Sequence, residues 1–285
     1  MLKLVTGDDK DEYHVNAYPY HCIFEQKGGN SEKSITDHSE AIRLNPTDAA
    51  LYYNRGSAYF NMDEYDMALA DINEAIRLDP KDASGYNVRG CNYIYMDDFE
   101  KAVADFDEAI RIDQKNTAMY SINRGHAYLC MGETDKAVAD YDEAIKLNTE
   151  ESVIAYVSRG HAHFDMGEYD KAIADYDESI RLGRKDAYVC YYRGRTYFGM
   201  GELDKAIADY GEAIRLDPDY SCIYGWRGIA YHQKGEFDKA IIDIETVVRL
   251  NPDFLEAKNA LERLRKGRSR QRRFKYRSAT GGRCR

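Results

Sequence analysis

The sequence predicts an all-α solenoid of stacked antiparallel helical hairpins, and three observations predict it. Glycines preceded by arginine recur at intervals of 34, 35, 35, 34 and 34 residues. Within each interval, apolar residues follow the spacing of an amphipathic helix. Gly and Pro residues separate one helical stretch from the next. A fixed period of this length indicates repeated units that must stack to bury their apolar faces. The recurring pairs are Arg55-Gly56, Arg89-Gly90, Arg124-Gly125, Arg159-Gly160, Arg193-Gly194 and Arg227-Gly228.

The stretch 187–220 shows how one unit is built. Its first half carries Tyr191, Tyr197 and Phe198, and its second half carries an apolar stripe from Leu203 to Leu216. Glycines lie between the halves, and a proline follows the second. Each unit is therefore a helical hairpin. Small residues equivalent to Gly194, Ala206 and Ala213 recur in most units, which lets two helix axes approach closely.

The chain divides along the repeat. Residues 1–14 precede it, and 15–48 form a degenerate unit whose second helix, "SITDHSEAIRLNP", is intact and whose first is interrupted by Pro19. The apolar residues of 253–266 predict a lone amphipathic helix that ends at Gly267. Residues 267–285 form a basic tail that we expect to be disordered. The six full units span 49–82, 83–117, 118–152, 153–186, 187–220 and 221–252.

The repeated pattern resembles the tetratricopeptide repeat, TPR. The residues that carry the resemblance are a small residue and Tyr in the first helix, then "GEYDKA", then Ala-Ile-x-Leu-x-Pro, over about 49–252. The resemblance implies a right-handed superhelical solenoid. It also implies that the helix at 253–266 covers the last hairpin, as the extra helix does in such arrays.

Composition limits the classes of protein. Of the 285 residues, 44% are hydrophobic, which indicates a folded chain. The first ten residues have no apolar core, and six scattered cysteines form no C-x-x-C pair. We therefore expect free thiols in a reducing, cytoplasmic compartment. No apolar run is long enough to span a membrane.

Two carboxylates in "GEYDKAIADYDESI", Asp175 and Asp177, raise the question of a metal site. Only the first recurs as Asp in every unit, whereas the second is replaced by Asn, Gly or Glu in other units. Each full unit has an Arg 16 residues before that Asp. We expect a structural ladder of ion pairs rather than a metal site. The sequence leaves open whether Asp175 pairs with Arg159 of its own unit or Arg193 of the next. The ladder comprises Arg55, Asp71, Arg89, Asp105, Arg124, Asp140, Arg159, Asp175, Arg193, Asp209, Arg227 and Asp243.

No residues indicate catalysis. His161 and His163 are two apart, so they point in different directions on a helix and cannot share a metal. The chain has no phosphate-binding glycine loop and no nucleophile with a correctly spaced His. We expect no enzyme activity, metal or cofactor.

The resemblance implies that the first helices line a concave groove. In this chain the groove positions are aromatic, amide-rich and nearly neutral, which suits recognition of an extended peptide or a partner protein. The alternative is that many of the residues at these positions only pack within the solenoid. The TPR subclass that clamps a chaperone's C-terminal carboxylate needs basic residues absent here, so we do not expect that ligand. The expected groove residues are Tyr53, Asn54, Asn87, Tyr95, Asn123, His126, His161, Tyr188, Tyr191, Tyr192, Arg195 and Trp226.

Charge divides the chain into an acidic body and a basic end. Residues 263–285 hold 11 Lys or Arg and no acid, whereas residues 1–262 hold 29 basic and 50 acidic residues, a formal charge of −21. Phe274 and Tyr276 lie among the arginines. This composition suits binding to a nucleic acid or another anionic surface through 267–285. The alternatives are a solvated extension or a localisation signal.

Overall fold

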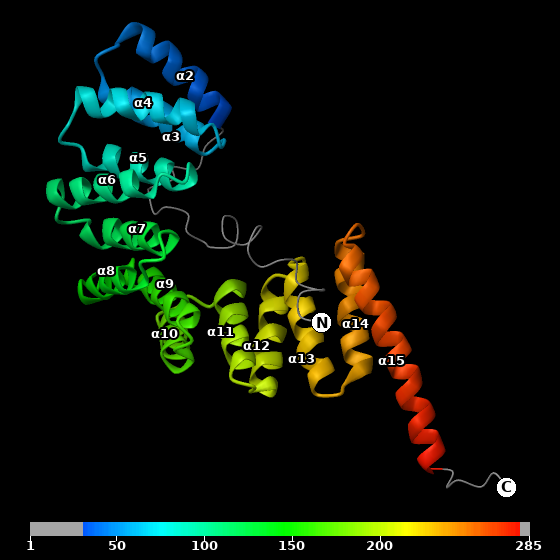
Figure 1. Cartoon of the computed structure of the whole chain (residues 1–285). Coiled ribbons are helices and arrows are strands. Elements are labelled where there is room, and N and C mark those ends of the chain that lie inside the picture. Colours follow the sequence, from blue (N-terminus) through cyan, green and yellow to red (C-terminus); the bar gives the residue numbers. More distant parts are fainter. Residues whose placement is uncertain (1–30, 280–285) are drawn as a thin grey trace. The chain divides into compact units, whose positions relative to one another are not determined.

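The computed structural model describes residues 31–279, with side chains to Gly267. In this range the chain forms 14 α-helices and no strand (Figure 1). The expectations for residues 1–30, including the first helix of the degenerate unit, and for 280–285 lie outside the described residues. The helices are α2 (Ser31–Leu44), α3 (Ala49–Phe60), α4 (Tyr65–Leu78), α5 (Ala83–Tyr95), α6 (Phe99–Ile112), α7 (Thr117–Cys130), α8 (Thr134–Lys146), α9 (Ser152–Asp165), α10 (Tyr169–Arg181), α11 (Ala187–Gly199), α12 (Leu203–Leu216), α13 (Ser221–Gln233), α14 (Phe237–Leu250) and α15 (Leu255–Ala279).

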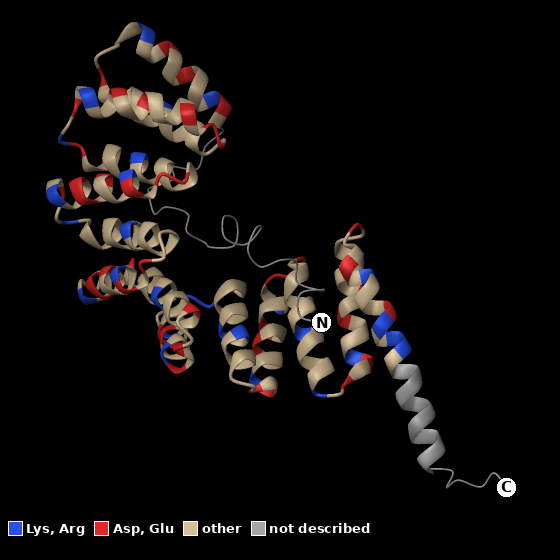
Figure 2. Cartoon of the chain, viewed as in Figure 1, with Lys and Arg blue, Asp and Glu red and all other residues tan. Residues whose placement is uncertain are grey.

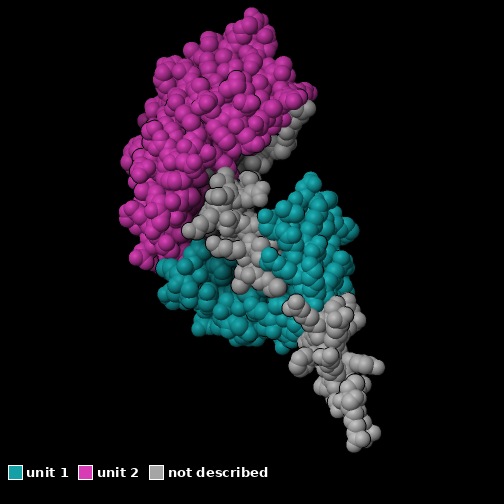
Figure 3. Space-filling view, turned by 45° about the vertical axis from the view of Figure 1, so that its right-hand side comes forward, with its two compact units in different colours: residues 1–17, 163–285 teal, residues 18–162 magenta. Residues whose placement is uncertain are grey.

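The chain divides into two compact units, coloured separately in Figure 3. The N-terminal unit ends at Ala162 within α9, and the C-terminal unit begins at His163. In the N-terminal unit, α3 packs on α4, α5 on α6 and α7 on α8, and successive hairpins are in contact. In the C-terminal unit, α11 packs on α12 and α13 on α14, and α15 covers α14. Each unit is thus a stack of helical hairpins.

Local sequence sets the helix ends. The carboxylates of Asp48 and Asp82 accept hydrogen bonds from the backbone N–H groups of Ala50 and Ser84 at the starts of α3 and α5, which satisfies otherwise unpaired donors. The turn inside four hairpins contains a glycine at positive φ, which a residue with a Cβ adopts only with strain. These glycines are Gly132, Gly167, Gly201 and Gly235, with φ between 73° and 79°.

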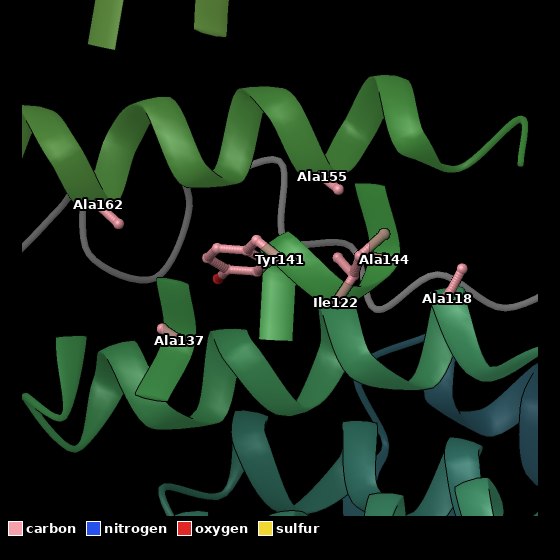
Figure 4. Packing of buried hydrophobic residues seen from close by; sticks show 7 residues of the cluster. All are labelled: Ala118, Ile122, Ala137, Tyr141, Ala144, Ala155 and Ala162. Atoms are coloured by element: carbon pink, nitrogen blue, oxygen red, sulfur yellow. The ribbon is translucent and has the colours of Figure 1, made fainter. Parts of the chain in front are cut away.

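The helices of a hairpin cross closely where the recurring glycine faces a large buried side chain. This side chain is a ring opposite Gly90, Gly125 and Gly194, and an isoleucine opposite Gly56 and Gly228. In the third hairpin, a Cβ on Gly125 would lie 2.6 Å from the ring of Tyr141, which is fully buried. Figure 4 shows this ring from α8 near three small residues, Ala137 of the same helix and Ala155 and Ala162 of α9. The small residue on one helix therefore makes room for the ring of its partner.

The last helix differs from the expectation. Ala257, Ala260, Leu261 and Leu264 are buried, and α15 packs against α14. However, α15 does not end at Gly267 but continues to Ala279. No proline follows this glycine, and the Arg, Lys and Gln residues after it are good helix formers. One glycine weakens a helix by about 1 kcal/mol, which does not by itself end it. The basic segment is therefore helical as far as Ala279, where disorder was expected.

Candidate functional site

The first helices of the hairpins form a continuous layer within each unit. Among the described residues, α3 contacts α5 and α5 contacts α7 in the N-terminal unit, and α11 contacts α13 in the C-terminal unit. The first helices α3, α5, α7, α11 and α13 carry no acidic residue, and α9 carries only Asp165. The other acidic residues lie on the second helices, on α15 and in the loops (Figure 2). The repeated Arg of each first helix pairs with Asp side chains of the second helices. Besides these, the layer carries the opposite formal charges of Arg195 and Asp165, so with its paired carboxylates it is close to neutral.

The structure separates the expected groove residues into two groups. Seven are at most 8% exposed, so they form the interior of the layer: Asn87, Asn123, His126, His161, Tyr191, Tyr192 and Trp226. Five are exposed or partly exposed and can contact a ligand: Tyr53, Asn54, Tyr95, Tyr188 and Arg195. Ser84, Met119 and Cys222, at the second position of their units, are also partly exposed. Spacing alone could not separate these groups, because residues of the same register differ in burial from unit to unit.

In the C-terminal unit, Arg195 lies among aromatic rings. Its guanidinium is 4.7 Å from the ring centroid of Trp226 and 5.3 Å from that of Phe164. Tyr188 lies two turns before it on α11 and packs against Tyr192, with ring centroids 4.5 Å apart. Contact with aromatic faces restricts the guanidinium. Tyr188 and Arg195 thus present a ring and a fixed cation on the first-helix layer.

In the N-terminal unit, the polar residues of the layer bond to one another. Asn123 donates to the side-chain oxygen of Asn87 at 2.8 Å, and a ring nitrogen of His126 lies 3.0 Å from the hydroxyl of Ser158. Burial, with the nearby His161 as a second cause, holds the pKa of His126 well below its usual value. His126 is therefore neutral at pH 7. These groups stabilise the interior of the layer rather than present free donors.

The Arg–Asp pairs form within hairpins. In five hairpins the guanidinium donates two hydrogen bonds of 2.5–2.9 Å to the Asp 16 residues later. Their side chains are 19–20% exposed for Arg and 3–11% for Asp. Burial raises the pKa of the Asp140 carboxyl, and Arg124 acts in the opposite direction. The two hydrogen bonds from the Arg therefore offset the cost of burying the Asp carboxylate. The pairs are Arg55–Asp71, Arg89–Asp105, Arg124–Asp140, Arg193–Asp209 and Arg227–Asp243.

In five of the six Arg residues, a further N–H reaches the preceding second helix, which explains the second carboxylate of the Asp175-x-Asp177 pair. Arg193 donates to Asp177 at 2.6 Å and makes its bidentate bond to Asp209, so Arg193 is not the bidentate partner of Asp175. An acceptor at the register of Asp177 serves the next Arg in other hairpins too, and it need not be acidic. Equivalent acceptors are Ser39 for Arg55, Asn73 for Arg89, Asp107 for Arg124 and Asp142 for Arg159.

Gly211 occupies this register in α12 and lacks the acceptor. A Cβ built there would lie 3.8 Å from Nη1 of Arg227. We expect Gly211→Asp to raise the free energy of unfolding by about 1 kcal/mol, because it adds a partner for Arg227 and removes a glycine from a helix interior. Urea denaturation of Gly211→Asp and of the control Gly211→Ala measures both effects. Only the gain from Asp should shrink in high salt; an equal response of both variants to salt would contradict the ion pair.

The described residues contain neither a cluster of metal ligands nor a membrane-spanning helix. Within them, no group of three or more His, Cys, Asp or Glu side chains has the arrangement to hold a metal. Cys91, Cys130, Cys190 and Cys222 are not in disulfide bonds. No helix in the described part of the chain is both long and apolar enough to cross a membrane.

Family models for "TPR repeat" match residues 27–63 and 194–235, and models for "Tetratricopeptide repeat" match 49–82, 83–116, 122–187 and 223–254. These matches cover most of the chain. The chain belongs to the tetratricopeptide repeat family. The stack of hairpins described above is accordingly a TPR solenoid, as the sequence predicted. No significant match is found among curated proteins.

Solved structures with a similar fold are also TPR-like. One is a chain of the "APC/C hetero-tetramer Cut9-Hcn1", with TM-score 0.69 and 15% identity; the match covers 82% of this chain and 46% of that one, so this chain spans less than half of it. A TPR protein from Parabacteroides merdae has TM-score 0.63 and 21% identity; the match covers 82% of this chain and 92% of that one. MamA has TM-score 0.52 and 27% identity; the match covers 57% of this chain and 94% of MamA.

Proposed function

We propose that the protein is a non-catalytic scaffold that binds an extended peptide or partner protein along its first helices. One observation carries the proposal: the first-helix layer is free of acidic residues apart from Asp165, yet it retains partly exposed aromatic and basic side chains. Tyr and Arg are the residue types that most often anchor protein interfaces. Family membership supports binding of proteins as the general role. The chemistry of the layer favours a ligand of low net charge.

Tyr188 and Arg195 are the anchors best suited to a test. Both are partly exposed on α11, and both contact the buried aromatic residues beneath them without being part of that buried set. Replacing Tyr191, Tyr192 or Trp226 would instead open the interior, because these side chains are 1–7% exposed. Substitution of the two accessible residues therefore separates binding from folding.

Affinity capture from native lysate tests the proposal with the double variant Tyr188→Ser and Arg195→Gln. We expect proteins captured by the wild type to be lost with this variant. The control is Tyr197→Ser, because Tyr197 is a partly exposed residue of the same helix whose ring faces Lys205 of the second helix α12. Circular dichroism must show unchanged helicity. Equal capture by the double variant and the wild type would contradict the proposal.

A further inference from the structure

Exposed methionines recur at the turn that joins the two helices of a hairpin. Met62, Met96, Met166 and Met200 occupy the same position in four hairpins and are 37–39% exposed. Met67, in the first turn of α4, is 47% exposed. Thioether side chains adapt to partners of irregular shape, and methionine is over-used at binding surfaces. These methionines lie at the turns between helices, outside the layer of first helices.

The first two turns differ from the later ones in charge. Residues 62–67 and 96–101 together hold six acidic residues and one Lys, a formal charge of −5. The equivalent residues 166–171 and 200–205 hold four acidic residues and two Lys, a formal charge of −2. Part of the difference comes from Met67, which occupies the position of a Lys in each later hairpin. There the Lys pairs with the acidic residue three positions earlier, as Lys171 does with Glu168.

Two of the extra carboxylates replace glycine. Asp63 and Asp97 have φ of 61° and 59°, at the position where the next four hairpins have a glycine of positive φ. A glycine would fit this backbone without strain. Asp→Gly at these positions therefore removes charge without backbone strain; at Asp63 it also removes the hydrogen bond that the carboxylate accepts from the Tyr65 hydroxyl at 2.7 Å.

The first two turns belong to one surface. The ring of Tyr65, next to the first turn, stacks on the ring of Tyr95, next to the second, with centroids 5.3 Å apart and planes at 14°. The ring of Phe60 packs edge-on against both. The acidic methionine surface, residues 62–67 and 96–101, thus combines three exposed thioethers with six carboxylates on an aromatic base in the N-terminal unit. It also contains Lys101, which pairs with Asp98.

We propose that the acidic methionine surface binds the basic C-terminal segment, residues 263–285, of a second copy of the chain. Charge complementarity identifies this occupant, because the segment carries 11 Lys or Arg and no acidic residue. The segment also contains Phe274 and Tyr276, and aromatic rings make favourable contacts with thioether sulfur. Arginine in turn suits recognition of carboxylates. Such contacts would associate the copies head to tail.

Sedimentation velocity of the full chain over a range of concentrations and salt tests this proposal. We expect reversible self-association that weakens in high salt. The triple variant Asp63→Gly, Met67→Lys and Asp97→Gly gives the first two turns the residue types and the charge of −2 found in the later ones. It should weaken association at least about tenfold, or about 1.4 kcal/mol. The control Met166→Gln and Met200→Gln, at the same position of later hairpins, should associate like the wild type.

A mixing experiment identifies the two contacting parts. A chain lacking 268–285 keeps the surface and the buried residues of α15 up to Leu264, whereas the triple variant keeps the segment. Each alone should be monomeric, and their mixture should form a complex. Self-association that survives loss of the segment would overturn the proposal. A wild-type chain that is monomeric at every concentration would also overturn the proposal. If the segment then only confers retention on heparin, its ligand is a nucleic acid or another polyanion.

Discussion

Asp140→Ala lowers the free energy of unfolding by about 3 kcal/mol, at the lower end of the range for breaking a buried ion pair. The carboxylate of Asp140 is 8% exposed and accepts two hydrogen bonds from Arg124, which is 19% exposed. Removing it leaves the guanidinium largely buried with only Asp107 of the preceding hairpin as a partner. The change is measured as a shift of the urea midpoint.

The matched control is Asp107→Asn, which alters the other carboxylate on the same Arg124. Asp107 is 54% exposed, and the equivalent Asn73 accepts the same kind of bond from Arg89. We expect a loss below about 0.5 kcal/mol. Similar losses for Asp140→Ala and Asp107→Asn would contradict the assignment of the buried carboxylate as the main partner.

Gly125→Leu destabilises the protein by about 3 kcal/mol or more, because the helix crossing has no space for a side chain. Even a Cβ would lie 2.6 Å from the fully buried ring of Tyr141, which has no exposed direction in which to move. Thermal unfolding followed by circular dichroism measures the loss. Gly267→Leu serves as the control, since nothing lies within 4 Å of a Cβ at that position of α15. A lower melting temperature for Gly267→Leu than for Gly125→Leu would contradict this account of the crossing.

The sequence predicts the fold well because the repeat states the same structural requirement six times. The glycine equivalent to Gly125, the large apolar residue that faces it and the Arg 16 residues before Asp recur together, so each hairpin supports the interpretation of the others. The prediction that the last helix ends at Gly267 is wrong, because good helix formers follow this glycine and α15 continues to Ala279. A signal that occurs once carries less information than one that recurs.

The candidate site was less predictable from sequence. Register alone places both Tyr188 and Tyr191 on the first-helix layer, but Tyr191 is 1% exposed whereas Tyr188 is partly exposed. Burial depends on neighbouring hairpins, and the residues that fill the space differ from one hairpin to the next. The dual role of each Arg was also hidden. Arg193 binds Asp209 within its hairpin and Asp177 of the preceding one, and only the geometry shows that a single guanidinium serves both.

Site-specific photocrosslinking tests the central claim, binding along the first helices, most directly. A photoreactive phenylalanine analogue replaces Tyr188 in one sample and Tyr197 in another. Both residues are partly exposed on α11, but the ring of Tyr197 faces Lys205 of the second helix. The proposal predicts that a captured partner protein crosslinks at position 188 and not at position 197. Crosslinking at 197 alone, with none at 188, would contradict it.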